Sequence, residues 1–240
     1  MMYLVIILIG VLAGTLSGVV GTGASIMLLP ALTYTFGPKA AIPIMAIAAI
    51  MGNVSRVILW RKEINYKAFM LYAIPGIPAA VLGANTLWVM PVELSNLCIG
   101  LFFLLLIPLR RWAKTQAFTL NSVQLALVGA VVGYLTGVVF STGPITIPIF
   151  AGYGLVKGAL LSTEAAASFA IYLAKASTFE AIGALPASVF ICGILVGSTL
   201  IMGTLIGRRF VLRLSENVFN RLIDAMLLIA GVSLLWDAVV

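Results

Sequence analysis

Residues 121–152 read NSVQLALVGAVVGYLTGVVFSTGPITIPIFAG, a run of 32 residues without a charged side chain. A helix that crosses the hydrocarbon core of a bilayer needs about 20 residues, so this run is too long for one ordinary crossing. Near its middle, Ser141–Pro144 and then Pro148 interrupt the run with small and helix-breaking residues. The run therefore predicts either one long tilted helix or a helix, a break and a shorter helix that returns to the same side.

A second long apolar run, residues 3–36, carries the same pattern, with its break at Gly21–Gly23 and a proline at Pro30. Three stretches correspond in the two runs and just beyond them: residues 14–20 (GTLSGVV) with 133–139 (GYLTGVV), 29–30 (LP) with 147–148 (IP), and 39–41 (KAA) with 157–159 (KGA). Such a likeness indicates that the chain arose by internal duplication.

The likeness extends to two cations inside apolar segments. Arg56 stands four residues before Trp60, as Lys175 stands four residues before Phe179. We infer two repeats, at residues 1–115 and 121–240, within a single transmembrane domain over residues 1–240.

The composition places the whole chain in a membrane. Of its 240 residues, 62% are hydrophobic and 9% are charged, whereas an average soluble domain has about 25% charged residues. This excludes a water-soluble fold, a disordered chain and a nucleic-acid-binding domain. Because hydrocarbon accepts only helices and closed barrels, and because the apolar runs do not alternate, we expect an all-α integral membrane protein. The other apolar segments lie near residues 41–60, 66–88, 92–109, 158–179, 186–206 and 216–237.

The positive charges distinguish the two interpretations of the long runs. If every segment crosses once, the two sides hold six and five Lys and Arg, without bias. If each long run folds back as a hairpin, one side holds ten and the other only Lys39. The positive-inside rule favours the second arrangement. The loops predicted to be cytoplasmic are 61–67, 110–120, 153–157 and 207–215, and those predicted outside are 37–40, 89–91 and 180–185.

Each repeat then makes five membrane passages, an odd number, so the second repeat is inverted and both termini lie outside. The predicted fold is two inverted-topology repeats, each a broken-helix hairpin followed by three transmembrane helices. Inverted repeats with broken helices are a common construction of secondary transporters. We therefore expect a multi-pass plasma-membrane transporter that works by alternating access around a central site.

The two breaks are the candidate substrate site. A helix that begins inside the membrane presents unpaired N–H groups and the positive end of its dipole, which suits an anion. Glycines permit a close approach to the backbone, and hydroxyls add donors. The candidate residues are Gly21, Thr22, Gly23, Ser25, Ser141, Thr142, Gly143 and Thr146. The glycines at 10, 14, 18, 129, 133 and 137 follow a small-xxx-small spacing, which predicts helix packing instead.

Three charged residues inside apolar segments add to the candidate site. Arg56 and Lys175 either attract the anion or extend to the membrane interface. Glu164 is interpreted as an acid at the N-terminus of its helix, and proton coupling is the alternative role.

An enzymatic function is not expected. The chain has no His, which removes imidazole-dependent catalysis and His metal sites. Cys98 and Cys192 are single residues in apolar segments, interpreted as small buried hydrophobes rather than a disulfide or a metal pair. No phosphate-binding or dinucleotide motif is present, so we expect neither a cofactor nor a metal.

The duplicated breaks resemble the signature of the TauE/SafE family, the sulfite-exporter-like permeases. The residues that carry the resemblance are Gly14, Gly18, Gly21–Ser25 and Pro30–Leu32, with the echo Gly133, Gly137, Gly143 and Pro148. The resemblance implies a transporter that exports sulfite, an organosulfonate or a related small anion across the lipid bilayer. An anion channel and an uptake permease for sulfur-containing or carboxylate anions are the alternatives.

Overall fold

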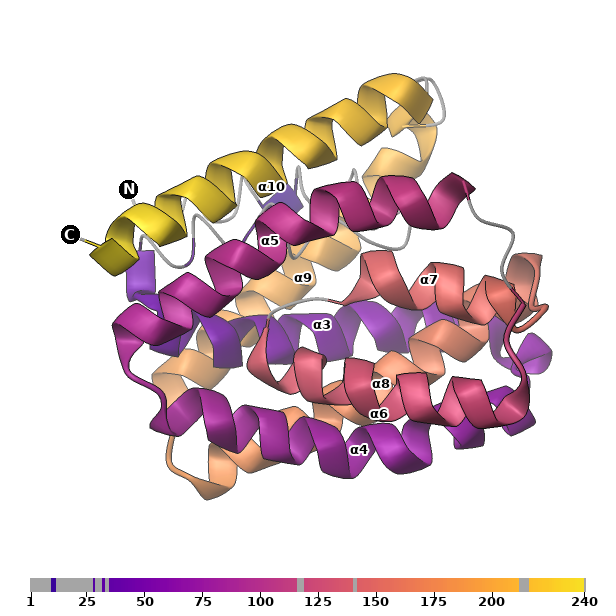
Figure 1. Ribbon diagram of the computed structural model, residues 1–240, viewed down its shortest axis with the longest axis horizontal. Coiled ribbons are helices and arrows are strands. Elements are labelled where there is room, and N and C mark those ends of the chain that lie inside the picture. The colour runs from indigo at the N-terminus through magenta and orange to yellow at the C-terminus, as the bar shows by residue number, and fades with distance from the viewer. Residues whose placement is uncertain are drawn as a thin grey trace.

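The structure is a computed structural model, and it describes residues 10–11, 28, 32, 35–115, 119–139, 142–211 and 216–239. Every regular element in these residues is a helix, as expected (Figure 1). The helices are α3 (Pro38–Trp60), η1 (Arg61–Glu63), α4 (Tyr66–Val89), α5 (Val92–Thr115), α6 (Ser122–Val138), α7 (Gly143–Gly152), α8 (Lys157–Ala181), α9 (Ala187–Val211) and α10 (Glu216–Val239).

The lengths and hydropathy of these helices suit a bilayer. Three described segments are long and apolar enough to cross one: Lys39–Ile58, Tyr66–Val89 and Val92–Leu109. Shorter apolar stretches lie at Ser122–Val138, Ala187–Gly203 and Leu227–Ala238. The segments of this second group lie in the second half of the chain.

The long run at residues 121–152 forms a hairpin of α6 and α7. Asn121 and Gln124 form a capping box at the start of α6, and α6 ends just before the break. The backbone N–H of Leu120 then donates to the carbonyl of Gly152 over 2.8 Å, so the end of α7 lies beside the start of α6. The prediction of a returning helix is confirmed for this run, and the single long helix is wrong. Most of the corresponding run at residues 3–36 lies outside the described residues.

The glycines of α6 pack against α4, as their spacing predicted. A side chain at Gly129 would meet the backbone of Tyr72, and one at Gly133 would meet the backbone of Gly76. Gly137 lies equally close to the backbone of Ala80. The two helices therefore approach at backbone distance, side by side in Figure 1. In the first repeat, Gly10 lies against Thr199 of α9, and the glycines at 14 and 18 are outside the described residues.

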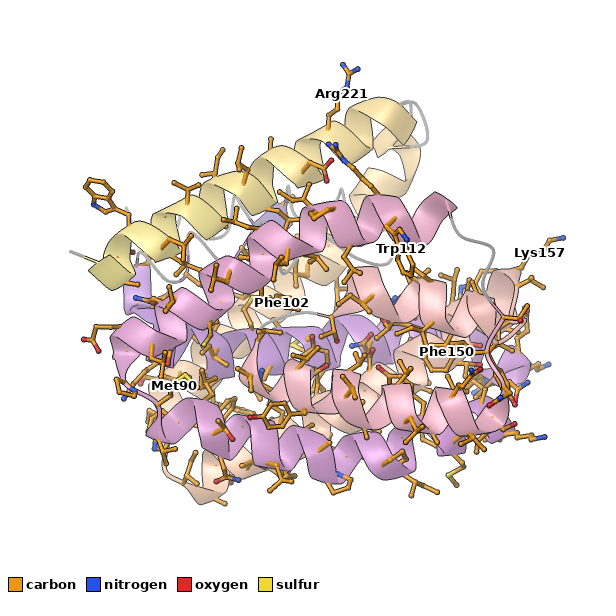
Figure 2. The ribbon with its side chains drawn as sticks, in the orientation of Figure 1. Met90, Phe102, Trp112, Phe150, Lys157 and Arg221 are labelled. Atoms are coloured by element: carbon orange, nitrogen blue, oxygen red, sulfur yellow. The ribbon has the colours of Figure 1, made fainter. Side chains whose placement is uncertain are left out.

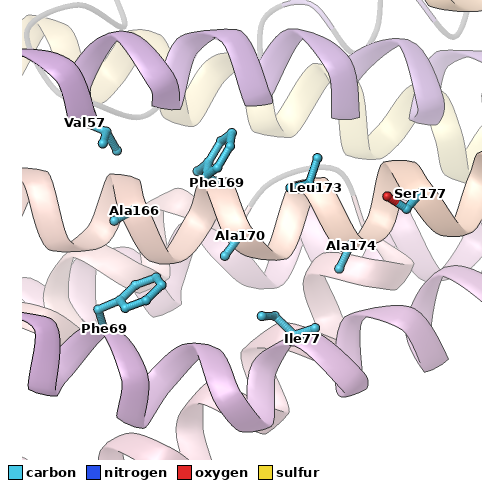
Figure 3. Close-up of a pocket in the computed structure, with 9 residues that line it drawn as sticks. All are labelled: Val57, Phe69, Ile77, Ala166, Phe169, Ala170, Leu173, Ala174 and Ser177. Atoms are coloured by element: carbon cyan, nitrogen blue, oxygen red, sulfur yellow. The ribbon is translucent and has the colours of Figure 1, made fainter.

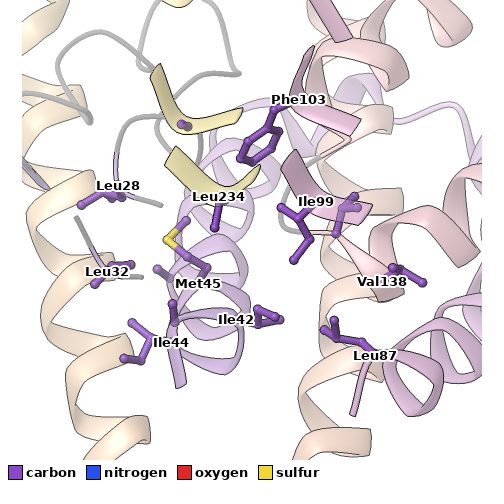
Figure 4. Close-up of a cluster of buried hydrophobic side chains, with 14 of the residues drawn as sticks. Leu28, Leu32, Ile42, Ile44, Met45, Leu87, Ile99, Phe103, Val138 and Leu234 are labelled. Atoms are coloured by element: carbon purple, nitrogen blue, oxygen red, sulfur yellow. The ribbon is translucent and has the colours of Figure 1, made fainter. Parts of the chain in front are cut away.

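Further helix contacts join the two halves of the chain. Helix α3 packs on α8 and α9, α4 packs on α8, and α5 packs on α10. A large apolar cluster fills the space among them and includes Leu28, Met45, Phe103, Val138 and Leu234 (Figure 4). Near the ends of α5 and α10, Arg111 pairs with Asp224 over 2.7 Å.

Loops predicted to share a side of the membrane lie together. Loop 110–120 meets the end of α7 through the Leu120–Gly152 hydrogen bond. Loop 61–67 meets the start of α8, since Glu63 lies against Gly158 and the Asn65 N–H donates to the Thr163 hydroxyl. At the opposite end, the Lys39 ammonium lies 5.6 Å from the ring centre of Trp88. Lys157 points away from the bundle (Figure 2).

Which end faces the cytoplasm is tested by labelling. We expect single cysteines at Lys62, Lys114 and Arg209 to be protected from an impermeant thiol reagent on intact cells, because positive loops stay inside. A cysteine at Lys39 is the matched control and should react. Labelling of all three loop positions, with protection at position 39, would show that the protein has the opposite orientation in the membrane.

Candidate functional site

Buried polar side chains of α8 point toward the α6–α7 break. Glu164 and Lys175 are each 1% exposed, and Ser168 lies one turn after Glu164. Helix α8 packs against α3, α4, α6 and α7. Its polar residues therefore meet the break from within the protein rather than from lipid.

Lys175 binds the end of α6. Its Nζ donates to the carbonyl oxygens of Thr136 over 2.6 Å and of Val139 over 2.8 Å. The last carbonyls of a helix lack partners within that helix, and a cation is stabilised at this negative end of the dipole. The Phe179 ring lies 5.7 Å from Nζ. Of the two roles left open for Lys175, extension to the membrane interface is wrong, because its ammonium is held in the interior.

Two threonine hydroxyls connect the end of α6 with the start of α7 across the break. The Thr136 hydroxyl donates to the carbonyl of Val132 over 2.7 Å and lies 2.6 Å from the Thr142 hydroxyl. Because a hydroxyl has one proton, Thr142 is the donor to Thr136. The Thr142 side chain makes no capping hydrogen bond to α7. The start of α7, with its positive dipole end, therefore lies beside the lysine-bound end of α6.

Glu164 binds a second group of polar side chains. Together with Lys175, Thr136 and Thr142, this group forms the polar cluster. Its Oε2 pairs with Arg56 Nη1 over 3.0 Å, and its Oε1 accepts from the hydroxyls of Thr146 over 3.0 Å and Ser168 over 2.8 Å. The other guanidinium nitrogen, Nη2, donates to Asn53. The interpretation of Glu164 as a helix-terminal acid is wrong, because α8 begins at Lys157, two turns earlier.

The structure brings part of the candidate set together. Thr146, Glu164 and Arg56 are in contact, and Thr142 and Lys175 are joined through Thr136. Gly143 begins α7. The others lie outside the described residues: Gly21, Thr22, Gly23, Ser25 and Ser141.

Three residues of the cluster carried only weak sequence signals. Asn53 and Ser168 each lie one helical turn from a buried charge, on the same face. Thr136 corresponds to Ser17 in the repeat alignment. Single Asn, Ser and Thr residues are common in apolar helices. Their closeness in sequence to a charged residue was therefore the signal that could have identified Asn53 and Ser168.

In the first repeat, the positions that correspond to Thr146 and Glu164 hold apolar residues. When Leu29–Pro30 is aligned with Ile147–Pro148, Leu28 corresponds to Thr146. When Arg56 is aligned with Lys175, Met45 corresponds to Glu164. Leu28 and Met45 are fully buried in the apolar cluster. The polar cluster is thus a property of the second repeat, completed by Arg56 from the first.

An apolar groove of about 450 Å³ lies between α3, α4 and α8 (Figure 3). Its lining is Val57, Phe69, Ile77, Ala166, Phe169, Ala170, Leu173, Ala174 and Ser177. It offers a small anion only the Ser177 hydroxyl, so it is not the anion site. Over the described ranges, no three His, Cys, Asp or Glu side chains gather where a metal ion could bind.

One comparison with known proteins gave a match. The model of the family described as "Sulfite exporter TauE/SafE" matches residues 6–234 of the chain. Comparisons with curated proteins and with solved structures gave no match.

Proposed function

The chain belongs to the sulfite exporter TauE/SafE family, and on that premise we propose that it is a secondary transporter that exports sulfite or an organosulfonate across the plasma membrane by alternating access. Membership alone makes it a membrane transporter of sulfur-containing anions rather than an enzyme. Beyond membership, we propose the direction of transport, the alternating-access mechanism and the residues that bind the anion.

The α6–α7 hairpin carries the proposal. Helix α7 has 10 residues, about 15 Å of helix, so it is too short to cross a bilayer. Its first turn begins beside the buried ammonium of Lys175, and Thr142 and Thr146 place hydroxyls on it. Such a helix start, with hydroxyls and a nearby cation, suits a small oxyanion.

The helix contacts are those expected of two repeats related by a twofold axis. Exchange of the repeats replaces α3 by α8 and α4 by α9. The contact of α3 with α9 then becomes that of α8 with α4, and both are present. The contacts of α3 with α8 and of α5 with α10 each map onto themselves. This symmetry supports alternating access around a central site.

The proposed site combines both breaks. From the second repeat it takes Thr142, Gly143 and Thr146, together with Ser141, and the nearby cations are Lys175 and Arg56. From the first repeat it takes the corresponding break: Gly21, Thr22, Gly23 and Ser25. Lys175 acts by holding the end of α6 and by its charge.

A panel of anions tests the proposal. We expect sulfite or a sulfonate such as sulfoacetate to raise the thermal unfolding temperature of the purified protein, because a ligand that binds only the folded state stabilises it. Sulfate, taurine and acetate should have smaller effects. Proteoliposome flux of the best anion should saturate, whereas high unitary conductance would favour the channel. Stabilisation by acetate alone would contradict the proposed substrate class.

Two variants in the same assay locate the site at the breaks. Thr22→Val and Ser141→Ala each remove a hydroxyl with little change in volume. Loss of one hydrogen bond costs about 0.5–1.5 kcal/mol, and more if the partner is charged, so we expect roughly tenfold weaker binding. Thr86→Val is the matched control, because the Thr86 hydroxyl, which donates to the carbonyl of Leu82 and accepts from the Tyr134 hydroxyl, belongs to neither break. Unchanged affinity in both break variants would remove these hydroxyls from the site.

A further inference from the structure

The ion pair of Arg56 and Glu164 joins the two repeats inside the protein. Arg56 belongs to α3 in the first repeat, and Glu164 belongs to α8 in the second. The Glu164 side chain is 2% exposed and that of Arg56 is 23% exposed. A charge so deep in a membrane protein is costly unless it is paired, and such charges are usually functional.

The groups that hold the Glu164 carboxylate are also those that would hold a sulfonate. A guanidinium binds one oxygen, and the hydroxyls of Thr146 and Ser168 bind the other. Guanidinium and hydroxyl donors recognise any small oxyanion in this way. The buried Tyr72 hydroxyl on α4, which lies near Glu164, has no hydrogen-bond partner among the described residues.

We propose that Glu164 is a tethered competitor of the substrate: its carboxylate occupies Arg56 and Thr146 in the empty transporter, and the anion replaces it there as Glu164 takes up one proton. The inference rests on the proposed function and deepens it, because it names the coupling ion and the residue that carries it.

The exchange balances in charge and in hydrogen bonds. The proton comes from solvent and binds a carboxylate oxygen of Glu164, and the anion takes over the pairing with Arg56. Arg56 with ionised Glu164 has no net charge, and Arg56 with a monovalent anion and protonated Glu164 has none either. The empty and the loaded transporter therefore carry the same charge at this site throughout the transport cycle. The Thr146 hydroxyl, whose one proton now lies within reach of both Glu164 and the carbonyl of Gly143, donates that proton to the anion.

The charged and titratable groups around Glu164 are few. Arg56 faces it from α3 and Tyr72 from α4. On η1, Glu63 lies at the exposed end of the bundle, against the first turn of α8. On α8 itself are Tyr172 and Lys175, the latter bound to α6 carbonyls, with Lys157 and Glu180 near the two ends of the helix. Helices α6 and α7 contain no Asp, Glu, Lys or Arg.

Calorimetry on the purified full-length protein in nanodiscs tests the exchange. The probe is ethanesulfonate, whose sulfonate stays ionised at physiological pH. Titrations in buffers of different ionisation enthalpy give the number of protons bound per anion. For the natural protein we expect about one proton taken up per anion, and affinity that weakens by up to about tenfold for each unit of rising pH.

Substitutions of Glu164 distinguish a role in proton coupling from a purely structural role. Glu164→Gln should bind ethanesulfonate about tenfold tighter at alkaline pH, with no proton uptake and no dependence on pH. Glu164→Asp, which keeps a carboxyl, should retain proton uptake. Asp224→Asn is the control, since it alters a different inter-helix ion pair, that of Arg111 with Asp224, and it should match the natural protein.

The outcomes are distinguishable. Binding by the natural protein without proton uptake overturns the exchange and leaves the proposed function standing. The same result follows if Glu164→Gln keeps both the proton uptake and the pH dependence of the natural protein. Absence of binding in every variant overturns the exchange together with the proposed substrate class. If Glu164→Gln does not fold, the proton count of the natural protein and of Glu164→Asp decides.

Discussion

Replacing Lys175 with methionine should abolish most transport and destabilise the protein. The ammonium holds two carbonyls at the end of α6, and methionine has similar length but no donor. Each buried carbonyl left without a partner costs about 1–3 kcal/mol. The end of α6 fixes where α7 begins, so the proposed anion site should be displaced, with flux reduced roughly tenfold or more.

The measurement is flux in proteoliposomes together with the free energy of unfolding in mixed micelles. Lys39→Met is the matched control, because Lys39 is exposed and lies over Trp88 at the end of the bundle. Lys175→Arg keeps the charge and should recover part of both quantities. Natural flux and stability in Lys175→Met would show that the end of α6 needs no cation.

Replacing Gly133 with alanine should separate α4 from α6. The added Cβ would lie 2.7 Å from the Cα of Gly76 and 2.9 Å from its carbonyl carbon, closer than carbon atoms pack. Backbone cannot rotate away as a side chain can, so the helices must shift. Overpacking of this kind costs about 1–3 kcal/mol, and the unfolding free energy should fall by that amount.

Gly52→Ala is the matched control within a helix. A Cβ at Gly52 meets nothing within 4 Å, and alanine is favoured over glycine in a helix interior by up to about 1 kcal/mol. The two substitutions are chemically identical, yet the expected changes in stability have opposite signs. Equal effects at both positions would mean that backbone contact with Gly76 does not limit the packing of α6.

The packing glycines and the returning hairpin were predictable from local features. Gly129, Gly133 and Gly137 share one face of α6 because a helix repeats about every four residues. The break at residues 141–144 was visible because small, polar and helix-breaking residues follow one another there. Single prolines carry a weaker signal, since Pro75 and Pro78 lie inside α4 and Pro148, expected to interrupt the run, lies inside α7. The direction of α7 followed from loop charges, since positive loops stay on one side of the membrane.

The partners of the buried charges were not predictable in the same way. The duplication suggested equal roles for Arg56 and Lys175, but the structure gives them different partners. Arg56 binds a carboxylate 108 residues away, and Lys175 binds carbonyls 36 and 39 residues away. A pairing over such separations depends on how α3, α6 and α8 cross, which no local pattern encodes.

By itself, then, the sequence determined that this chain is a helical membrane protein with a broken helix at residues 121–152, because hydropathy, glycine spacing and loop charge act locally. Tertiary structure alone decided that Glu164 is bound to Arg56 and that Lys175 is bound to the end of α6. The physical reason is the low dielectric of the interior, where a buried charge must find a partner. Which partner it finds is set by the helix packing that brings distant residues into contact.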